Sequence, residues 1–253
     1  MKAYYQDDRV KLYNEDCLKF LKNLPSESVD IIITDPAYSG MNNKMNFGNG
    51  RIVGKYKDKE NGKWFKEFKD DPNTFTQFLL ECYRVLRNDR HIYIMFDSFS
   101  LLSLASLMRE VFQVKNILVW DKINIGMGHY FRRRHELIVF ATKGRKKLNT
   151  KSMPDIWQIK RITRIEYPTQ KPVELFETMI KVSANKNYVV CDPFFGSGSS
   201  LIAAIKNNCK FVGSDISEKA NETTVKRYKR FKAFGLDSKL KPTKLPATRN
   251  MFE

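Results

Sequence analysis

The chain has 253 residues, 42% of them hydrophobic, and its 45 lysine and arginine residues against 28 aspartate and glutamate residues leave a formal net charge of +17. This length suits one large domain, no apolar run is long enough to span a bilayer, and the N-terminus lacks a secretory signal. The four cysteines have no paired spacing, which argues against a zinc site or a disulfide frame and predicts a reducing, cytoplasmic location. The excess positive charge favours a nucleic-acid partner.

Apolar periodicity predicts strands and helices that alternate along the chain. In the first half these are a strand at 10–13, a helix at 17–24, a strand at 29–34, a helix at 75–86, a strand at 90–96 and a helix at 101–112. In the second half they are strands at 116–120 and 137–141, a helix at 172–182, a strand at 188–191, a helix at 200–207, a strand at 211–215 and a helix at 218–231. The alternation predicts an α/β fold with a doubly wound, mostly parallel sheet, and the two consecutive strands predict an antiparallel hairpin at the sheet edge.

A glycine-rich turn, residues 192–198 (DPFFGSG), lies between a predicted strand and a predicted helix. Its glycines allow tight turning, and the exposed amides at the start of the helix favour a carboxylate or another anion. Asp192 is suited to a cationic amino group, and Asp215 ends the next strand, where related folds place an acid on ribose hydroxyls. These groups suit a positively charged nucleoside such as S-adenosylmethionine better than a diphosphate. Many strand-to-helix turns without a cofactor contain a similar glycine pair.

A second loop, residues 35–38 (DPAY), follows the buried strand at 29–34. The exocyclic amine of a nucleobase is a weak nucleophile because its lone pair is delocalised into the ring. The Asp35 carboxylate and the Pro36 carbonyl can accept its two hydrogens and so direct the lone pair at a methyl donor, and Tyr38 can stack on a base that has left the duplex. Alone, the loop also reads as an ordinary strand-ending turn. Because both loops follow parallel strands, together they favour methyl transfer to a base.

With these residues in view, the chain resembles the amino-methyltransferases that act on DNA, over about residues 9–230. Residues 35–38 match the family's catalytic Asp-Pro-Pro-Tyr tetrad with alanine in place of the second proline, and residues 192–198 match its S-adenosylmethionine loop. Residues 167–172 (YPTQKP) match its His-Pro-Thr-Gln-Lys-Pro segment, and residues 14–17 (NEDC) resemble its acidic strand end near the cofactor adenine. The tetrad precedes the cofactor loop, as in the β group, and its aspartate is typical of adenine enzymes.

The resemblance implies a Rossmann-like methyltransferase fold and a sequence-specific enzyme that methylates the N6 amine of adenine in double-stranded DNA by base flipping and direct in-line transfer. The implied catalytic residues are Asp35, Pro36 and Tyr38. The implied cofactor-binding residues are Asp16, Cys17, Asp35, Lys171, Asp192, Phe194, Phe195, Gly196, Ser197, Gly198, Ser199 and Asp215, with Lys171 expected to approach the cofactor carboxylate. No metal site is expected.

Basic residues in and near two segments, 39–73 and 143–166, are predicted to recognise DNA. The predicted contacts are Arg132, Arg133, Arg134, Arg145, Lys146, Lys147, Lys160, Arg161 and Arg164. Trp157 lies within the second segment and is equally suited to stack on DNA or to anchor the segment in the core.

The resemblance also implies a domain organisation and a biological setting. Residues 1–236 would form the catalytic domain and residues 237–253 a flexible basic tail. The expected location is the cytoplasm, for a protein encoded by a bacterium or a phage, and the further partners that the resemblance suggests are a second copy of the chain and a cognate restriction endonuclease. Two alternatives stay open: methylation of a cytosine N4 amine or an RNA base by the same loops, and a non-catalytic DNA-binding protein of the same fold.

Overall fold

The computed structural model describes residues 1–38, 68–69, 71–126, 130–163, 166–167 and 169–235. The predicted tail 237–253, Arg164 and most of the predicted segment 39–73 lie outside these residues.

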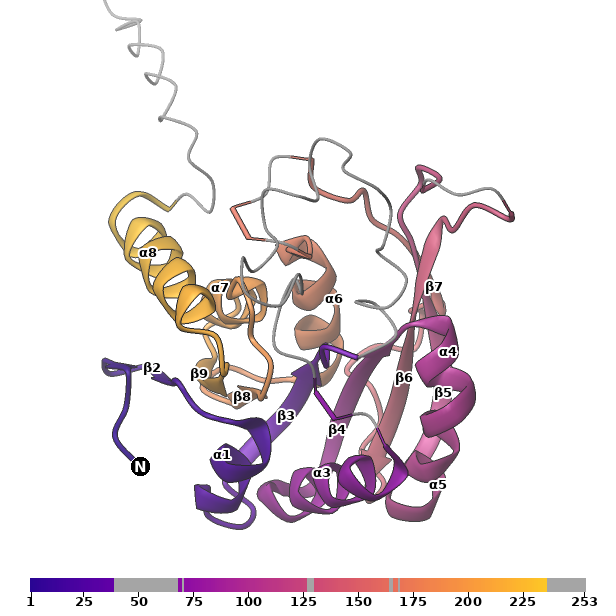
Figure 1. Ribbon diagram of the computed structural model, residues 1–253, viewed down its shortest axis with the longest axis horizontal. Helices are drawn as coiled ribbons and strands as arrows, with labels where there is room; N and C mark the ends of the chain where they lie inside the picture. The colour runs from indigo at the N-terminus through magenta and orange to yellow at the C-terminus, as the bar shows by residue number, and fades with distance from the viewer. Residues whose placement is uncertain (39–67, 70, 127–129, 164–165, 168, 236–253) are drawn as a thin grey trace, which may run out of the picture.

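One nine-stranded sheet runs through the described part of the chain, in the order β1-β2-β9-β8-β3-β4-β6-β5-β7 (Figure 1). Its strands are β1 (Tyr5–Gln6), β2 (Val10–Tyr13), β3 (Val29–Thr34), β4 (Leu86–Phe96), β5 (Gln113–Asp121), β6 (His135–Lys143), β7 (Ile156–Gln158), β8 (Val189–Asp192) and β9 (Lys210–Ser214). From β2 to β4 neighbouring strands are parallel, whereas β6 is antiparallel to both β4 and β5. The predicted doubly wound, mostly parallel sheet with an antiparallel hairpin is confirmed.

Helices cover both faces of this sheet. They are α1 (Cys17–Asn23), α3 (Pro72–Val85), α4 (Ser98–Leu104), the 3₁₀ turn η2 (Ala105–Leu107), α5 (Met108–Val111), α6 (Val173–Ser183), α7 (Ser199–Lys206) and α8 (Glu218–Phe234). Successive residues of β3 face opposite sides: Ile31 and Ile33 pack in the core that contains α6, α7 and α8, while Ile32 packs in the core that contains α1 and α3. This two-residue alternation lets one continuous apolar strand serve two cores.

Two local features differ from the predicted elements. The predicted helix at 101–112 is divided into α4, η2 and α5. The predicted hairpin is not the outermost pair, because β7 adds to the outside of β5 in parallel. Trp157 on β7 is only 5% exposed, and its indole nitrogen donates to the Pro154 carbonyl oxygen at 2.7 Å. Burial of this indole draws part of the basic segment into the sheet, so Trp157 is a core anchor here.

The carboxyl ends of the parallel strands place three acidic residues at one edge of the sheet. Asp35 follows β3, Asp192 ends β8, and Asp215 follows β9. The pairing of Ile32 with Cys191, and of Asp192 with Gly213, fixes the register that brings these ends together. No helix of the described residues is long and apolar enough to cross a membrane.

Candidate active site

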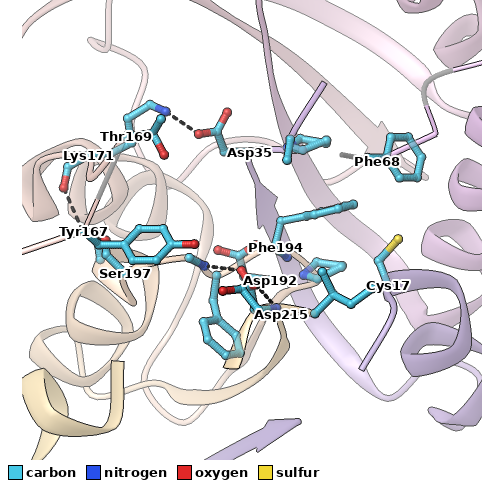
Figure 2. Close-up of a pocket in the computed structure, with 18 of the residues that line it drawn as sticks. Cys17, Asp35, Phe68, Tyr167, Thr169, Lys171, Asp192, Phe194, Ser197 and Asp215 are labelled. Atoms are coloured by element: carbon cyan, nitrogen blue, oxygen red, sulfur yellow. Dashed lines mark hydrogen bonds and ion pairs between the residues drawn. The ribbon is translucent and has the colours of Figure 1, made fainter. Parts of the chain in front are cut away.

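A cavity of about 410 Å³ lies at this edge and takes its walls from both predicted loops (Figure 2). Its volume falls in the range of sites that enclose a small organic ligand. All of the predicted cofactor residues except Gly198 line it. Figure 2 shows the Lys171–Asp35 pair on one side of the cavity and Asp192 and Asp215 together on another. Residues 35–37 and 192–197 therefore face one space, although the sequence separates them widely.

The glycine-rich turn gets its shape from backbone conformations that other residues rarely adopt. Gly196 and Gly198 have φ values of 53° and 78°, in the left-handed region. A Cβ on Gly198 would lie 2.6 Å from the Cγ2 atom of Thr224 on α8. Gly198 begins α7 as its N-cap. Gly198 is not among the residues that line the cavity, and its left-handed backbone and close approach to Thr224 shape the turn.

Asp192 is a buried carboxylate that lines the site. Only 2% of the residue is exposed, and its two oxygens accept hydrogen bonds from the Phe194 amide at 3.0 Å and the Ser200 hydroxyl at 2.6 Å. Burial raises the pKa of Asp192 to about 7 against these hydrogen bonds. A cationic group that enters the cavity would therefore stabilise the charged form of Asp192.

Asp215 holds the other side of the glycine-rich turn. Its carboxylate accepts from the Gly196 amide at 2.9 Å and from the Ser217 amide at 2.8 Å. Burial raises the pKa of Asp215 to about 6. Asp16 also lines the cavity, and it caps the N-terminus of α1 by accepting hydrogen bonds from the amides of Leu18 and Lys19.

Lys171 pairs with Asp35. Its ammonium donates to the Asp35 Oδ2 atom and lies 3.6 Å from the Glu136 Oε2 atom. Glu136 in turn lies 3.2 Å from the Nζ atom of Lys122. Burial raises the pKa of Asp35 although the Lys171 ammonium opposes it; for Glu136 the two ammonium groups outweigh burial and hold the pKa below its usual range.

Several parts of this site were missed at the sequence level. Glu136 enters from antiparallel β6, and no local pattern marks it. Glu136 is not among the lining residues and reaches the site through its contact with Lys171. Tyr167, Thr169 and Gln170 line the cavity but were assigned no role, although they belong to the YPTQKP segment that carries the family resemblance.

The remainder of the second loop is arranged differently from the predicted base platform. Pro36 and Ala37 line the cavity, and the Pro36 carbonyl accepts from the Tyr38 amide at 2.9 Å. Tyr38 itself is 1% exposed, and its ring stacks on Phe96 with centroids 5.4 Å apart. A backbone bridge to Phe68 holds it there. The ring lies in the core, because the chain turns inward directly after Ala37.

The predicted DNA contacts divide between opposite edges of the sheet. Residues 132–134 precede β6 and residues 160–161 follow β7, both at the edge that carries the cavity. Residues 145–147 follow β6 at the other edge, where the Arg145 amide donates to the Asp89 carboxylate at 2.7 Å. Arg134 makes two 2.6 Å bonds to Asp121 and holds the pKa of that carboxyl at about 2.

Comparison with known proteins agrees with the predicted family and fold. The family described as DNA methylase (N6_N4_Mtase) matches residues 29–226. The type II methyltransferase M2.LlaDCHI of Lactococcus lactis subsp. cremoris is 28% identical over 93% of this chain and 95% of that protein. DNA adenine methyltransferase YhdJ of Escherichia coli K12 is 25% identical over 84% of this chain and 80% of that protein. The crystal structure of an M1.HpyAVI–SAM complex has a TM-score of 0.62 and 21% identity, and the match covers 86% of this chain and 99% of that one.

The fold and the acidic cavity at its carboxyl edge define an α/β enzyme with a nucleoside cofactor. The chain belongs to the DNA methylase family. It is an enzyme that methylates DNA, and its cofactor is S-adenosylmethionine.

Proposed function

We propose that this enzyme methylates the N6 amine of adenine in double-stranded DNA at a specific sequence. The observation that carries the proposal is the shared cavity: the Asp35 carboxylate faces the same space as Asp192 and Asp215. The aspartate at the start of the 35–38 loop and the relative named as a DNA adenine methyltransferase both favour adenine.

The chemistry of the cavity fits the cofactor. Asp192, 2% exposed and with a pKa raised to about 7 by burial, suits the cofactor's ammonium group. Asp215 beside the glycine-rich turn suits ribose hydroxyls, and the ring of Phe194 adds apolar wall. When bound, S-adenosylmethionine supplies an electrophilic methyl group on a sulfonium.

The residues of the 35–38 loop act on the base. A flipped adenine would donate one amine hydrogen to Asp35 and the other to the Pro36 carbonyl, whose second lone pair is available beside the Tyr38 amide. Burial raises the pKa of Asp35, and the Lys171 ammonium opposes this rise and orients the carboxylate through its hydrogen bond. We assign Tyr38 to the support of this loop, because its ring packs on Phe96 in the core.

We propose that DNA lies across the carboxyl edge of the sheet. Residues 132–133 and 160–161 supply positive charge there, and Tyr130 and Phe131 are 95% and 103% exposed beside them. Alanine at residues 160 and 161 should weaken binding to every DNA sequence and reduce the salt dependence of the affinity. The same change at residues 145 and 147, on the other edge, is the matched control and should leave affinity and salt slope near those of the wild type.

The identity of the methylated base tests the proposal directly. DNA treated with the enzyme and S-adenosylmethionine is digested to nucleosides and analysed by mass spectrometry, with RNA in parallel. N6-methyladenine supports the proposal, whereas N4-methylcytosine or methylated RNA contradicts it. Asp35→Ala should abolish methylation while isothermal titration still detects cofactor binding. A wild-type chain that binds DNA but neither cofactor nor methyl product would be the non-catalytic alternative.

We further propose that residues 1–236 act as one catalytic domain, with the bacterial cytoplasm, where the DNA is, as its location. A homodimer and a cognate restriction endonuclease stay predictions from the resemblance, and analytical ultracentrifugation tests the first.

A further inference from the structure

Two carboxylates, Asp35 and Glu136, share one lysine, Lys171, which lines the cavity together with Asp35. Lys171 donates to Asp35 and lies 3.6 Å from Glu136, and Lys122 lies 3.2 Å from Glu136 on its far side. The four charged groups form a series of alternating sign, in the order Asp35, Lys171, Glu136 and Lys122. Lys171 is the most enclosed of them, with 9% of its side chain exposed, against 26% for Asp35 and 32% for Glu136. Loss of its carboxylate partner destabilises an ammonium this enclosed.

We propose that Glu136 is a positioning residue for methyl transfer: it takes over Lys171 when Asp35 receives the proton that the methylated amine releases. This inference rests on the proposed function of Asp35.

The balance of atoms in the reaction calls for such a partner. As the nitrogen–carbon bond forms and the bond from carbon to sulfur breaks, the amine nitrogen acquires a positive charge and must release one hydrogen as a proton. Asp35, already its hydrogen-bond acceptor, is the base at hand: the N–H bond breaks and an O–H bond forms on the carboxyl group. That protonation removes the negative charge that held Lys171.

The Lys171 ammonium has only a short distance to move from Asp35 to Glu136. Lys171 needs to close a gap of 3.6 Å to an ordinary ion-pair distance of about 2.8 Å, a movement of less than about 1 Å. Lys122 keeps Glu136 charged and in place through its own contact at 3.2 Å. Release of the proton to water then returns Lys171 to Asp35.

Charged groups from four elements set the proton affinity of Asp35. Lys171, from the segment before α6, lowers the pKa of this carboxyl, while Glu136 on β6 and Asp97, which follows β4, raise it. Asp192 at the end of β8 is a further like charge, since Asp35 raises the pKa of Asp192. Loss of the Glu136 charge should therefore lower the pKa of Asp35 and make it a weaker base.

Glu136→Gln tests the proposal, because it removes the charge and keeps the shape. We expect kcat for DNA methylation to fall about tenfold or more, the Kd for S-adenosylmethionine to stay within about twofold, and the acid limb of the kcat profile to move to lower pH. Lys171→Met should move that limb in the opposite direction. Glu177→Gln is the matched control, since Glu177 also bridges two lysines, Lys181 and Lys206, but on α6 and outside the cavity lining.

A titration without turnover provides a second measurement. Carbon-13 NMR of the Asp35 carboxyl in the cofactor-free protein should show a lower pKa in Glu136→Gln than in the wild type. An unchanged pKa with unchanged kcat overturns the proposal, and so does a loss of kcat that follows only a fall in Tm or in cofactor affinity. If the wild type methylates cytosine N4, the proposed adenine function fails while this comparison still decides the role of Glu136, because that amine also loses a proton.

Discussion

Replacement of Asp192 by asparagine should raise the unfolding free energy of the cofactor-free protein above neutral pH, because it removes a buried charge. Burial raises the pKa of Asp192 from an ordinary 3.8 to about 7. A carboxyl whose pKa is higher in the folded chain favours folding only while protonated, so its ionisation costs stability as pH rises from 3.8 through 7. At 1.36 kcal/mol per pH unit, this cost reaches about 4 kcal/mol above pH 7.

The cofactor-free Asp192→Asn variant should therefore match the wild type near pH 4 and exceed its unfolding free energy by up to about 4 kcal/mol at pH 8, which corresponds to roughly 8–16 °C in Tm. Denaturation at a series of pH values between these limits measures the difference, and Asp8→Asn, at an exposed position, is the control. A difference between variant and wild type that is the same at pH 4 and pH 8 would refute the reasoning. Isothermal titration should show that the variant has lost most of its affinity for S-adenosylmethionine.

Three further substitutions test the supports of the site. Gly198→Ala should lower the unfolding free energy by at least about 1–2 kcal/mol because alanine is strained at a left-handed φ, and by more because its Cβ would clash with Thr224. Thr224→Ser in the same chain removes the Cγ2 atom, so urea denaturation should show that part of the lost stability is recovered. Trp157→Ala should lower the unfolding free energy by about 3–5 kcal/mol and leave the DNA affinity of the folded protein unchanged, as measured by fluorescence anisotropy; a large affinity loss at full stability would instead indicate a DNA contact. Arg227 is fully buried and donates to the Ser197 carbonyl, so Arg227→Met should weaken cofactor binding in calorimetry through distortion of the glycine-rich turn, and an unaltered Kd would contradict this.

The local sequence pattern was sufficient to predict that the two loops, residues 35–38 and 192–198, follow buried parallel strands. The continuous apolar runs at β3 and β8 identified buried parallel strands, and such strands must place the residues after them at one edge of the sheet. The common edge of Asp35 and Asp192 follows from that rule, because it depends only on strand direction. Their common cavity also requires β3 and β8 to be neighbours in the sheet, which the tertiary structure decides.

Pairing order and side-chain burial were beyond the sequence by itself. Glu136 reaches Lys171 only because β6 inserts antiparallel between β4 and β5, a non-local choice that periodicity does not encode. Trp157 and Tyr38 could equally have met solvent or DNA, and only the space available in the assembled cores decided that both are buried. The sequence thus determined the strands, the helices and the acidic strand ends, whereas tertiary packing decided which charges share Lys171 and which basic residues lie beside the cavity.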